Sequence, residues 1–277
     1  MTVTAPTSLA GALAALADDP SSLVLAGGTD LMVQVNEGHR RPGPAPVLAL
    51  AGVPELRAVS RDRDELVVGA GVTFTELMAE PVAVLAPALA QAARTVGSPQ
   101  IRNAGTIGGN LGTASPAGDT LPVLVALGAT VEVASATARR ALPIGEFLTG
   151  PKATALAPGE LIVSVRVPVA HGPQEYLKVG VRNAMVIAVA SVAMVVDRDA
   201  GTVGVGLGSV GPTALSAPDA CAWLAVQDDW TSPAVADEFG TRVADAARPI
   251  DDHRGRASYR RHAVGVMARR ALRRCAR

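Results

Sequence analysis

Two short glycine-rich stretches are the parts of this sequence best suited to chemistry. The first covers residues 25–31 (Leu-Ala-Gly-Gly-Thr-Asp-Leu), and the second runs from residue 106 to residue 119. Each contains a double glycine among small hydroxyl, amide and carboxylate side chains. Successive backbone N–H groups in such turns form a concave site for anions, above all for phosphates. Further donors in the two stretches are Thr29, Thr106, Asn110, Thr113 and Ser115.

Together the two stretches predict a pyrophosphate site. A hydrogen bond to a charged group contributes about 1.5–3 kcal/mol, so several of them can hold a pyrophosphate without a lysine clamp. The alternative is that both stretches are ordinary tight turns, in which glycine serves only the backbone. The presence of two similar stretches favours the phosphate site.

Two charged residues allow two interpretations each. Asp119 either accepts a hydrogen bond from a ligand hydroxyl or caps the helix expected at 120–127. Lys178, one of only two lysines, follows an apolar strand. It either reaches a carbonyl or anion of a ligand or lies in solvent at the end of the strand.

Several other kinds of chemistry are excluded. Cys221 and Cys275 lie far apart and the four histidines have no metal-binding spacing, so we expect no metal or iron–sulfur site in this chain. The phosphate loop of nucleotide triphosphatases and the nucleophile elbow of hydrolases are both missing. The Gly-x-Gly-x-Gly at 204–208 leads to Gly211-Pro212 instead of a helix, which does not fit a Rossmann fold.

Composition narrows the class of protein. The 277 residues suit one large domain or two to three small ones, and 49% apolar with 3% aromatic residues predicts a globular core of small aliphatic side chains. A formal net charge of +0 gives no general attraction to nucleic acid, and no set of aromatic stacking residues accompanies the basic segment 258–277. No apolar run approaches the roughly 20 residues that span a bilayer, and no signal peptide is visible, so we expect a cytoplasmic location.

Apolar patterning predicts the elements that position the two stretches. A strand is expected at 23–25, directly before the first stretch. A proline-rich loop is expected at 40–46 and a turn at 143–147. Further strands are expected at 47–50, 66–71, 130–134, 161–167 and 175–179, and helices at 8–16, 31–35, 74–78, 84–96 and 120–127. After a boundary at 168–173 come a hairpin of strands at 186–197 and 202–210 and helices at 219–224, 234–247 and 258–274.

Residues 25–31, 97–111 and 114–119 resemble the FAD-binding (medium, M) subunit of the xanthine dehydrogenase/CO dehydrogenase family of molybdenum hydroxylases. The resemblance extends over nearly the whole chain. It implies an α+β protein with a two-subdomain FAD-binding PCMH fold, of the vanillyl-alcohol-oxidase type, at residues 1–170. Its subdomains would be about 1–53 and 54–170. A C-terminal domain like that of CO dehydrogenase flavoproteins, with a small antiparallel sheet and helices, would cover 174–277.

The resemblance also implies the residues that bind FAD. Residues 24–31 and 106–110 would wrap the pyrophosphate, Asp119 would contact the ribityl or ribose region, and Ile162 and Lys178 would approach the isoalloxazine. No catalytic residue and no metal ligand is implied. The full set is Val24, Leu25, Ala26, Gly27, Gly28, Thr29, Asp30, Leu31, Thr106, Ile107, Gly108, Gly109, Asn110, Thr113, Ser115, Asp119, Ile162 and Lys178.

The implied function is that of an electron-transfer oxidoreductase subunit. A large molybdopterin-binding subunit would oxidise the substrate, and a small subunit with two-iron two-sulfur clusters would carry electrons to FAD. The complex would be a dimer of heterotrimers. FAD would pass the electrons to an acceptor such as NAD or a quinone. Met185 and Val186 stand where animal xanthine dehydrogenases carry acidic residues, which leaves the acceptor open. The alternatives are a stand-alone FAD oxidoreductase of the same fold and a non-enzymatic anion- or nucleotide-binding protein that lacks flavin.

Overall fold

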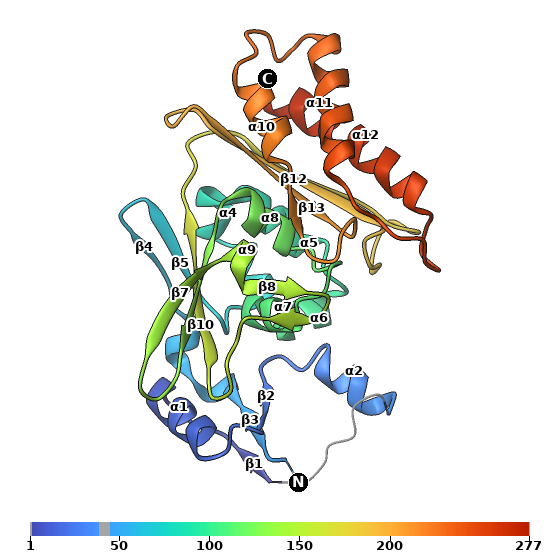
Figure 1. Ribbon diagram of the computed structural model, residues 1–277. Coiled ribbons are helices and arrows are strands. Elements are labelled where there is room, and N and C mark those ends of the chain that lie inside the picture. The colour runs from blue at the N-terminus through green and yellow to red at the C-terminus, as the bar shows by residue number, and fades with distance from the viewer. Residues whose placement is uncertain (1, 39–44, 277) are drawn as a thin grey trace.

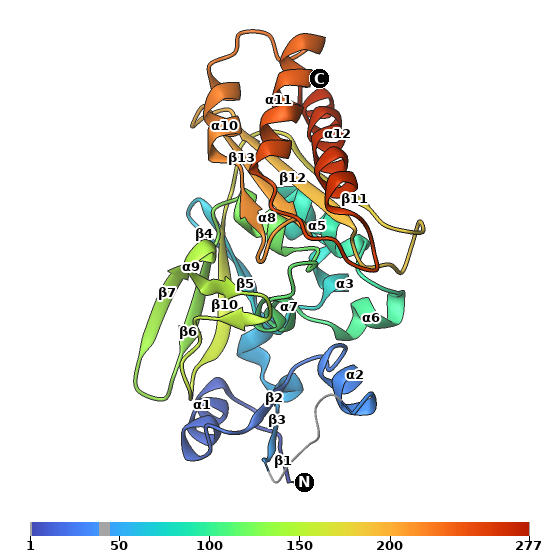
Figure 2. The ribbon, with the colours of Figure 1, turned by 45° about the vertical axis from the view of Figure 1, so that its right-hand side comes forward.

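The computed structural model describes residues 2–38 and 45–276, so most of the proline-rich loop expected at 40–46 lies outside the described residues. The chain forms an elongated body of three parts (Figure 1). A small N-terminal sheet lies at one end, a larger antiparallel sheet with helices lies in the middle, and a sheet covered by helices lies at the other end. A view from a second direction shows the same succession of parts (Figure 2).

The N-terminal part is a parallel three-stranded sheet in the order β1-β3-β2. Its elements are β1 (Val3–Thr4), α1 (Leu9–Asp18), β2 (Leu23–Leu25), α2 (Leu31–Asn36) and β3 (Val47–Ala49). The helix α1 begins at Ser8, whose hydroxyl accepts a hydrogen bond from Gly11 N. The first glycine stretch follows β2 at the carboxyl edge of the parallel sheet, where ligands of such sheets commonly bind.

The central part is built on a five-stranded antiparallel sheet in the order β4-β5-β10-β6-β7. Its strands are β4 (Val59–Asp62), β5 (Glu65–Gly69), β6 (Thr130–Ala134), β7 (Arg139–Pro143) and β10 (Leu161–Pro168). A hairpin of β8 (Leu148–Gly150) and β9 (Ala153–Thr154) lies beside this sheet. Two 3-10 turns, Leu50–Gly52 and Pro54–Arg57, connect the central part to the N-terminal part. Its helices are α3 (Phe74–Leu77), α4 (Val82–Leu85), α5 (Pro87–Arg94), α6 (Pro99–Ala104), α7 (Ile107–Thr113), α8 (Leu121–Ala126) and α9 (Ile144–Phe147).

The C-terminal part is a four-stranded antiparallel sheet between two layers of helices. The strands are β11 (Gln174–Val179), β12 (Ala190–Asp197), β13 (Thr202–Gly208) and β14 (Leu215–Ser216), and the helices are α10 (Pro218–Ala225), α11 (Pro233–Ala246) and α12 (Ala257–Cys275). The strands also contact α5 and α8 of the central part. A Cβ atom on Gly204 or Gly206 would lie 1.9 or 1.7 Å from a backbone oxygen of α8. These glycines therefore permit close packing of a helix on a sheet.

Several sequence-based expectations about elements are corrected by the structure. The second glycine stretch is not one loop, because its first half is the helix α7. The helix expected at 84–96 is two helices, since Pro87 has no N–H to continue α4 and instead begins α5. The turn expected at 143–147 contains the short helix α9, and the strand expected from 186 begins at Ala190.

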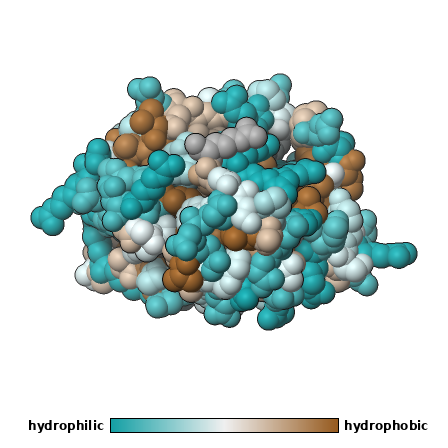
Figure 3. All heavy atoms as spheres, turned by 90° about the horizontal axis from the view of Figure 1, so that it is seen from above, coloured by the Kyte–Doolittle hydropathy of each residue, from teal (hydrophilic) through white to brown (hydrophobic). Residues whose placement is uncertain are grey.

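The surface of the C-terminal part is mixed in character. Seen from above, it carries hydrophilic side chains with smaller hydrophobic areas between them (Figure 3).

Within the described ranges, no helix combines the length and the apolar character that crossing a membrane requires.

Candidate cofactor site

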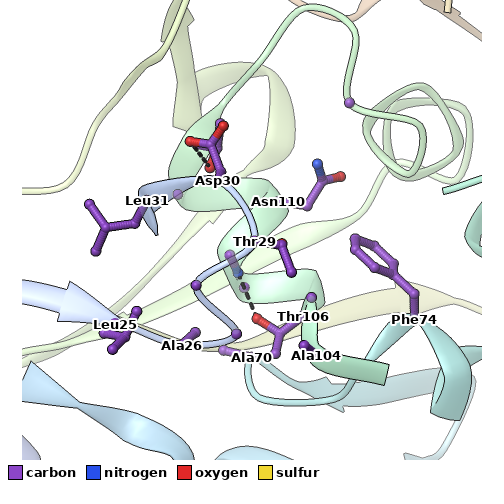
Figure 4. A pocket seen from close by; sticks show the side chains of 18 of the residues that line it. Leu25, Ala26, Thr29, Asp30, Leu31, Ala70, Phe74, Ala104, Thr106 and Asn110 are labelled. Atoms are coloured by element: carbon purple, nitrogen blue, oxygen red, sulfur yellow. Dashed lines mark hydrogen bonds between the residues drawn. The ribbon is translucent and has the colours of Figure 1, made fainter. Parts of the chain in front are cut away.

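A cleft of about 1080 Å³ runs between the N-terminal sheet and the central part. Both glycine stretches line it, and it extends to residues 185–187 and Arg254 of the C-terminal part. Ligand pockets commonly measure about 300–1000 Å³, so this cleft suits a large, extended ligand. Figure 4 shows the part of the cleft in which the two stretches meet.

The two stretches lie side by side although about eighty positions separate them in the sequence. Gly28 turns the chain after β2 with φ of 70°, a conformation that favours glycine. A Cβ atom on Gly27 would lie 1.7 Å from the backbone oxygen of Ala104, so only glycine allows this approach. The Thr113 hydroxyl donates to Asp30 Oδ2 at 3.4 Å across the gap (Figure 4).

The first stretch supplies unpartnered hydrogen-bond donors. Within the described part of the chain, the backbone amides of residues 26–30 donate to no protein acceptor. Residues 26–29 are half-buried and Asp30 is exposed, so these five amides are available to an acceptor that enters the cleft. Such a run of amides is the typical form of an anion-binding concavity.

The second stretch shapes the wall of the cleft, because the first backbone amides of its helix α7 already donate hydrogen bonds within the protein. Ile107 N donates to Val72 O at 3.0 Å, Gly108 N to Ala70 O at 2.8 Å, and Gly109 N to Thr106 Oγ1 at 2.9 Å. The anion therefore has to find its free backbone donors mainly on the first stretch, although the sequence predicts donors on both stretches.

The two adjacent glycines of α7 have different roles. A Cβ atom on Gly108 would lie 2.6 Å from both Cβ and O of Ala70, so Gly108 allows α7 to pack against the end of the central sheet. A Cβ atom on Gly109 would have only Thr106 Oγ1 within 4 Å, at 3.1 Å. Gly109 therefore faces the open cleft, and a side chain there would occupy the space of a ligand.

Asp119, Lys178 and Tyr176 form a buried cluster in the wall of the cleft. Lys178 Nζ donates to Asp119 Oδ2 at 2.8 Å and to Thr95 O at 3.2 Å, and the Tyr176 hydroxyl donates to Asp119 Oδ1 at 2.8 Å. The side chains of Lys178 and Asp119 are only 8% and 10% exposed. Burial raises the pKa of the Asp119 carboxyl, whereas Lys178 and Tyr176 act to lower it. Burial also raises the pKa of the Tyr176 hydroxyl well above its ordinary value of 10.0.

This cluster corrects two of the open interpretations from the sequence. Asp119 does not cap α8, because the N-cap residue is Thr120 and no side-chain cap bond is present. Lys178 is not a solvated strand end, because its ammonium group is buried in an ion pair. The strand β11 thus brings a cation from the C-terminal part to a carboxylate of the central part.

Nearly all the residues predicted to bind a ligand line the cleft. The exceptions are Ile107, which is buried in the core, and Lys178, which lies behind Asp119. Ile162 lines the cleft beside an irregularity in the pairing of β10 with β6. The lining residues are Val24, Leu25, Ala26, Gly27, Gly28, Thr29, Asp30, Leu31, Thr106, Gly108, Gly109, Asn110, Thr113, Ser115, Asp119 and Ile162.

Part of the cleft wall lies outside the residues predicted from the sequence. Phe74, Val96, Lys152 and Arg254 also line the cleft. None of them lies in a glycine-rich stretch, and Arg254 comes from the segment between α11 and α12. Only the folded chain brings these residues to the cleft, so no local pattern could have identified them.

Known protein families match both halves of the chain. The model described as the FAD binding domain in molybdopterin dehydrogenase matches residues 1–170, and that of the CO dehydrogenase flavoprotein C-terminal domain matches residues 175–275. The carbon monoxide dehydrogenase medium chain of Hydrogenophaga pseudoflava is 32% identical over 281 aligned positions, covering 97% of this chain and 94% of that protein. The nicotinate dehydrogenase FAD-subunit of Eubacterium barkeri is 34% identical, but the alignment spans only 65% of this chain and 62% of that protein.

Solved structures show the same architecture. A chain of Cu,Mo-CO dehydrogenase superposes with a TM-score of 0.90 at 29% identity, covering 100% of this chain and 97% of that one. A chain of quinoline 2-oxidoreductase from Pseudomonas putida 86 gives a TM-score of 0.91 at 27% identity, covering 100% and 96%. The predicted α+β fold, with an antiparallel sheet in its C-terminal part, is therefore confirmed.

Proposed function

Because this chain belongs to the family of FAD-binding medium subunits of xanthine dehydrogenase/CO dehydrogenase-type molybdenum hydroxylases, we propose that its cleft binds FAD through the residues described above. The family resemblance expected from the sequence is thereby confirmed, and with it the class of oxidoreductase subunit. The residues that hold the cofactor and the acceptor that receives its electrons are our proposal.

The observation that carries this proposal is the run of free amides at 26–30 opposite the open face of Gly109. The pyrophosphate of FAD needs hydrogen-bond donors and close approach to the backbone, and the cleft offers both here. Asp119 and Ile162 lie in other parts of the same lining and would contact the ribityl chain and the isoalloxazine. Lys178 acts on the ligand through Asp119.

FAD, when bound, accepts electrons one at a time and gives them up in pairs. The chain itself would bind and orient the cofactor and keep water from it. The cleft has an apolar lining that includes Val96, Ile162 and Val186. The carboxylate of Glu160, which also lines the cleft, forms an ion pair with Arg140 at 2.7 Å. Within the described residues, no group of histidine, cysteine, aspartate and glutamate could hold a metal ion.

The partners follow from the relatives. Several of these are named as medium chains or FAD subunits, which implies a large molybdopterin-binding subunit and a small iron–sulfur subunit in the same complex. We propose that two-iron two-sulfur clusters deliver electrons to FAD, which passes them to NAD or a quinone. We further propose a cytoplasmic dimer of heterotrimers, with residues 1–170 as the FAD-binding domain and 174–277 as the second domain.

The first experiment is an absorption spectrum of the purified chain before and after denaturation. We expect the bands of oxidised flavin, released on unfolding in a 1:1 ratio to protein. Should the protein be colourless, added FAD is titrated under native conditions. Failure to bind added FAD would overturn the proposal and favour a non-enzymatic anion-binding protein.

Co-expression tests the partners. We expect the chain to co-purify with the molybdopterin-binding and iron–sulfur subunits encoded by the same organism, and dithionite-reduced clusters to reduce the bound flavin. An FAD-loaded chain that does not associate with such subunits would instead support the stand-alone oxidoreductase.

A further inference from the structure

One polar side chain of the second glycine stretch keeps a free donor in the cleft. Asn110 lies in α7, is half-buried and lines the cleft (Figure 4). Its Oδ1 accepts a hydrogen bond, at 2.5 Å, from the hydroxyl of Thr120. Its Nδ2 has no partner within the described residues and stays accessible. An amide whose oxygen is held in this way presents its N–H groups to a ligand.

Thr120 serves Asn110 instead of its own helix. It is the N-cap residue of α8 and is 0% exposed, yet its side chain makes no cap hydrogen bond. A threonine at this position ordinarily accepts a hydrogen bond from the start of the helix that it precedes. The hydroxyl of Thr120 instead reaches back to α7, ten positions earlier in the chain. Thr120 does not line the cleft, so it is connected to the cleft through Asn110.

The chain leaves room beside the amide of Asn110. A Cβ atom on Gly118 would lie 2.9 Å from Asn110 Nδ2, and Gly118 lines the cleft. Gly118 N donates to Ser115 O at 2.8 Å, which fixes this turn. The free donor therefore lies against backbone that carries no side chain, and a ligand in the cleft can approach it.

The residue after Gly118, Asp119, has the opposite hydrogen-bond polarity. Lys178 Nζ and the Tyr176 hydroxyl donate to its two oxygens, each at 2.8 Å. These two donors favour the ionised carboxylate, which only accepts hydrogen bonds. A donor on Asn110 and an acceptor on Asp119 therefore lie close together on the wall of the cleft. A ligand that matches both presents an anionic oxygen next to a hydroxyl group.

We propose that Thr120 is a positioning residue for the cofactor. Its hydroxyl holds the amide of Asn110 so that Nδ2 donates to a phosphate oxygen of FAD, next to the FAD hydroxyl from which Asp119 accepts. In FAD the ribityl phosphate has these two groups on adjacent carbons, whereas the ribose has its free hydroxyls further from its phosphate. This inference rests on the proposed FAD site, and it adds a side-chain donor of the second stretch to the backbone amides of the first.

Two variants of Thr120 are compared by flavin fluorescence titration of the full chain with FAD. Thr120→Val keeps the shape of the side chain and loses the hydroxyl, whereas Thr120→Ser keeps the hydroxyl and loses the methyl group. We expect Thr120→Val to raise the Kd for FAD about 10-fold, because the amide loses its orientation, and Thr120→Ser to change it less than about twofold. Urea denaturation measures the stability of both variants, since a purely structural role would make FAD binding follow stability.

Asn110→Asp tests the polarity of the site without removing the Thr120 hydroxyl. The new carboxylate still accepts from that hydroxyl, but it offers no N–H group and adds a negative charge beside the phosphate. We expect a Kd for FAD at least about 100-fold higher, and this result does not depend on whether Thr120→Val folds. Thr120→Val is also combined with Asn110→Ala. If the hydroxyl acts through the amide, the double variant has the Kd of Asn110→Ala alone.

Ser164→Ala is the matched control. Ser164 is 5% exposed, its hydroxyl donates to the Glu132 carboxylate, and it does not line the cleft, so this variant should keep its FAD affinity. The inference is wrong if Thr120→Val and Thr120→Ser weaken FAD binding equally, if neither weakens it, if the effects of Thr120→Val and Asn110→Ala add, or if Asn110→Asp binds FAD as the unchanged chain does. An unchanged chain that does not bind FAD would overturn the proposed function itself, before any variant is compared.

Discussion

The Gly109→Val variant is expected to lose FAD while the chain remains folded. The only atom within 4 Å of a Cβ atom at this position is Thr106 Oγ1, so the added methyl groups point into the cleft. They would displace the pyrophosphate from the free amides of the first stretch. Loss of two or more hydrogen bonds to a charged group predicts a dissociation constant for FAD at least about 100-fold higher.

Folding should change little in this variant, because valine has a better helix propensity than glycine and only the Thr106 hydroxyl, at 3.1 Å, has to shift. Gly145→Val is the matched control: Gly145 also lies in a short helix, has no heavy atom within 4 Å of its Cβ position and does not line the cleft. FAD affinity is measured by flavin fluorescence and folding by urea denaturation. Retention of stoichiometric flavin at unchanged affinity by Gly109→Val would refute the phosphate cradle.

The Lys178→Met variant is expected to have the largest effect on stability. It removes the cation that pairs with Asp119 at 2.8 Å and leaves a buried carboxylate uncompensated. Breaking a buried ion pair in this way typically lowers the free energy of unfolding by about 3–5 kcal/mol. Because the pair joins β11 to the segment before α8, the variant should also bind FAD more weakly.

The stability deficit of Lys178→Met should depend on pH in a defined direction. Burial already raises the pKa of Asp119, and removal of Lys178 raises it further. A carboxyl group with a raised pKa in the folded state favours folding when protonated, and this contribution is lost as the pH rises through that pKa. The deficit should therefore be largest at neutral pH and shrink as the pH falls toward the ordinary pKa of aspartate.

Urea denaturation at pH 5 and pH 8 measures this difference. The double variant Asp119→Asn, Lys178→Met serves as the control, since it contains no unpaired charge and should recover much of the lost stability at pH 8. An equal deficit at both pH values, or no recovery in the double variant, would show that the ion pair has no role in stability.

The sequence determined the main elements and the place of the cleft. Strand β2 and the hairpin of β12 and β13 follow from local apolar patterning, and both glycine stretches border the cleft as expected. These features depend on residues that are neighbours in the chain. Hydrophobic periodicity and the backbone freedom of glycine act over a few residues, so they can be read without the fold.

The fold alone decided how each residue of the site is used. Two of the first amides of α7 are engaged by Ala70 and Val72, more than thirty positions away, so the run of consecutive free amides lies on the first stretch. Lys178 pairs with Asp119, 59 positions away, and Arg254 reaches the cleft because Arg260 holds its turn against the C-terminal sheet. Whether a donor is free or a charge is paired depends on what the fold places beside it, and those partners come from distant parts of the chain.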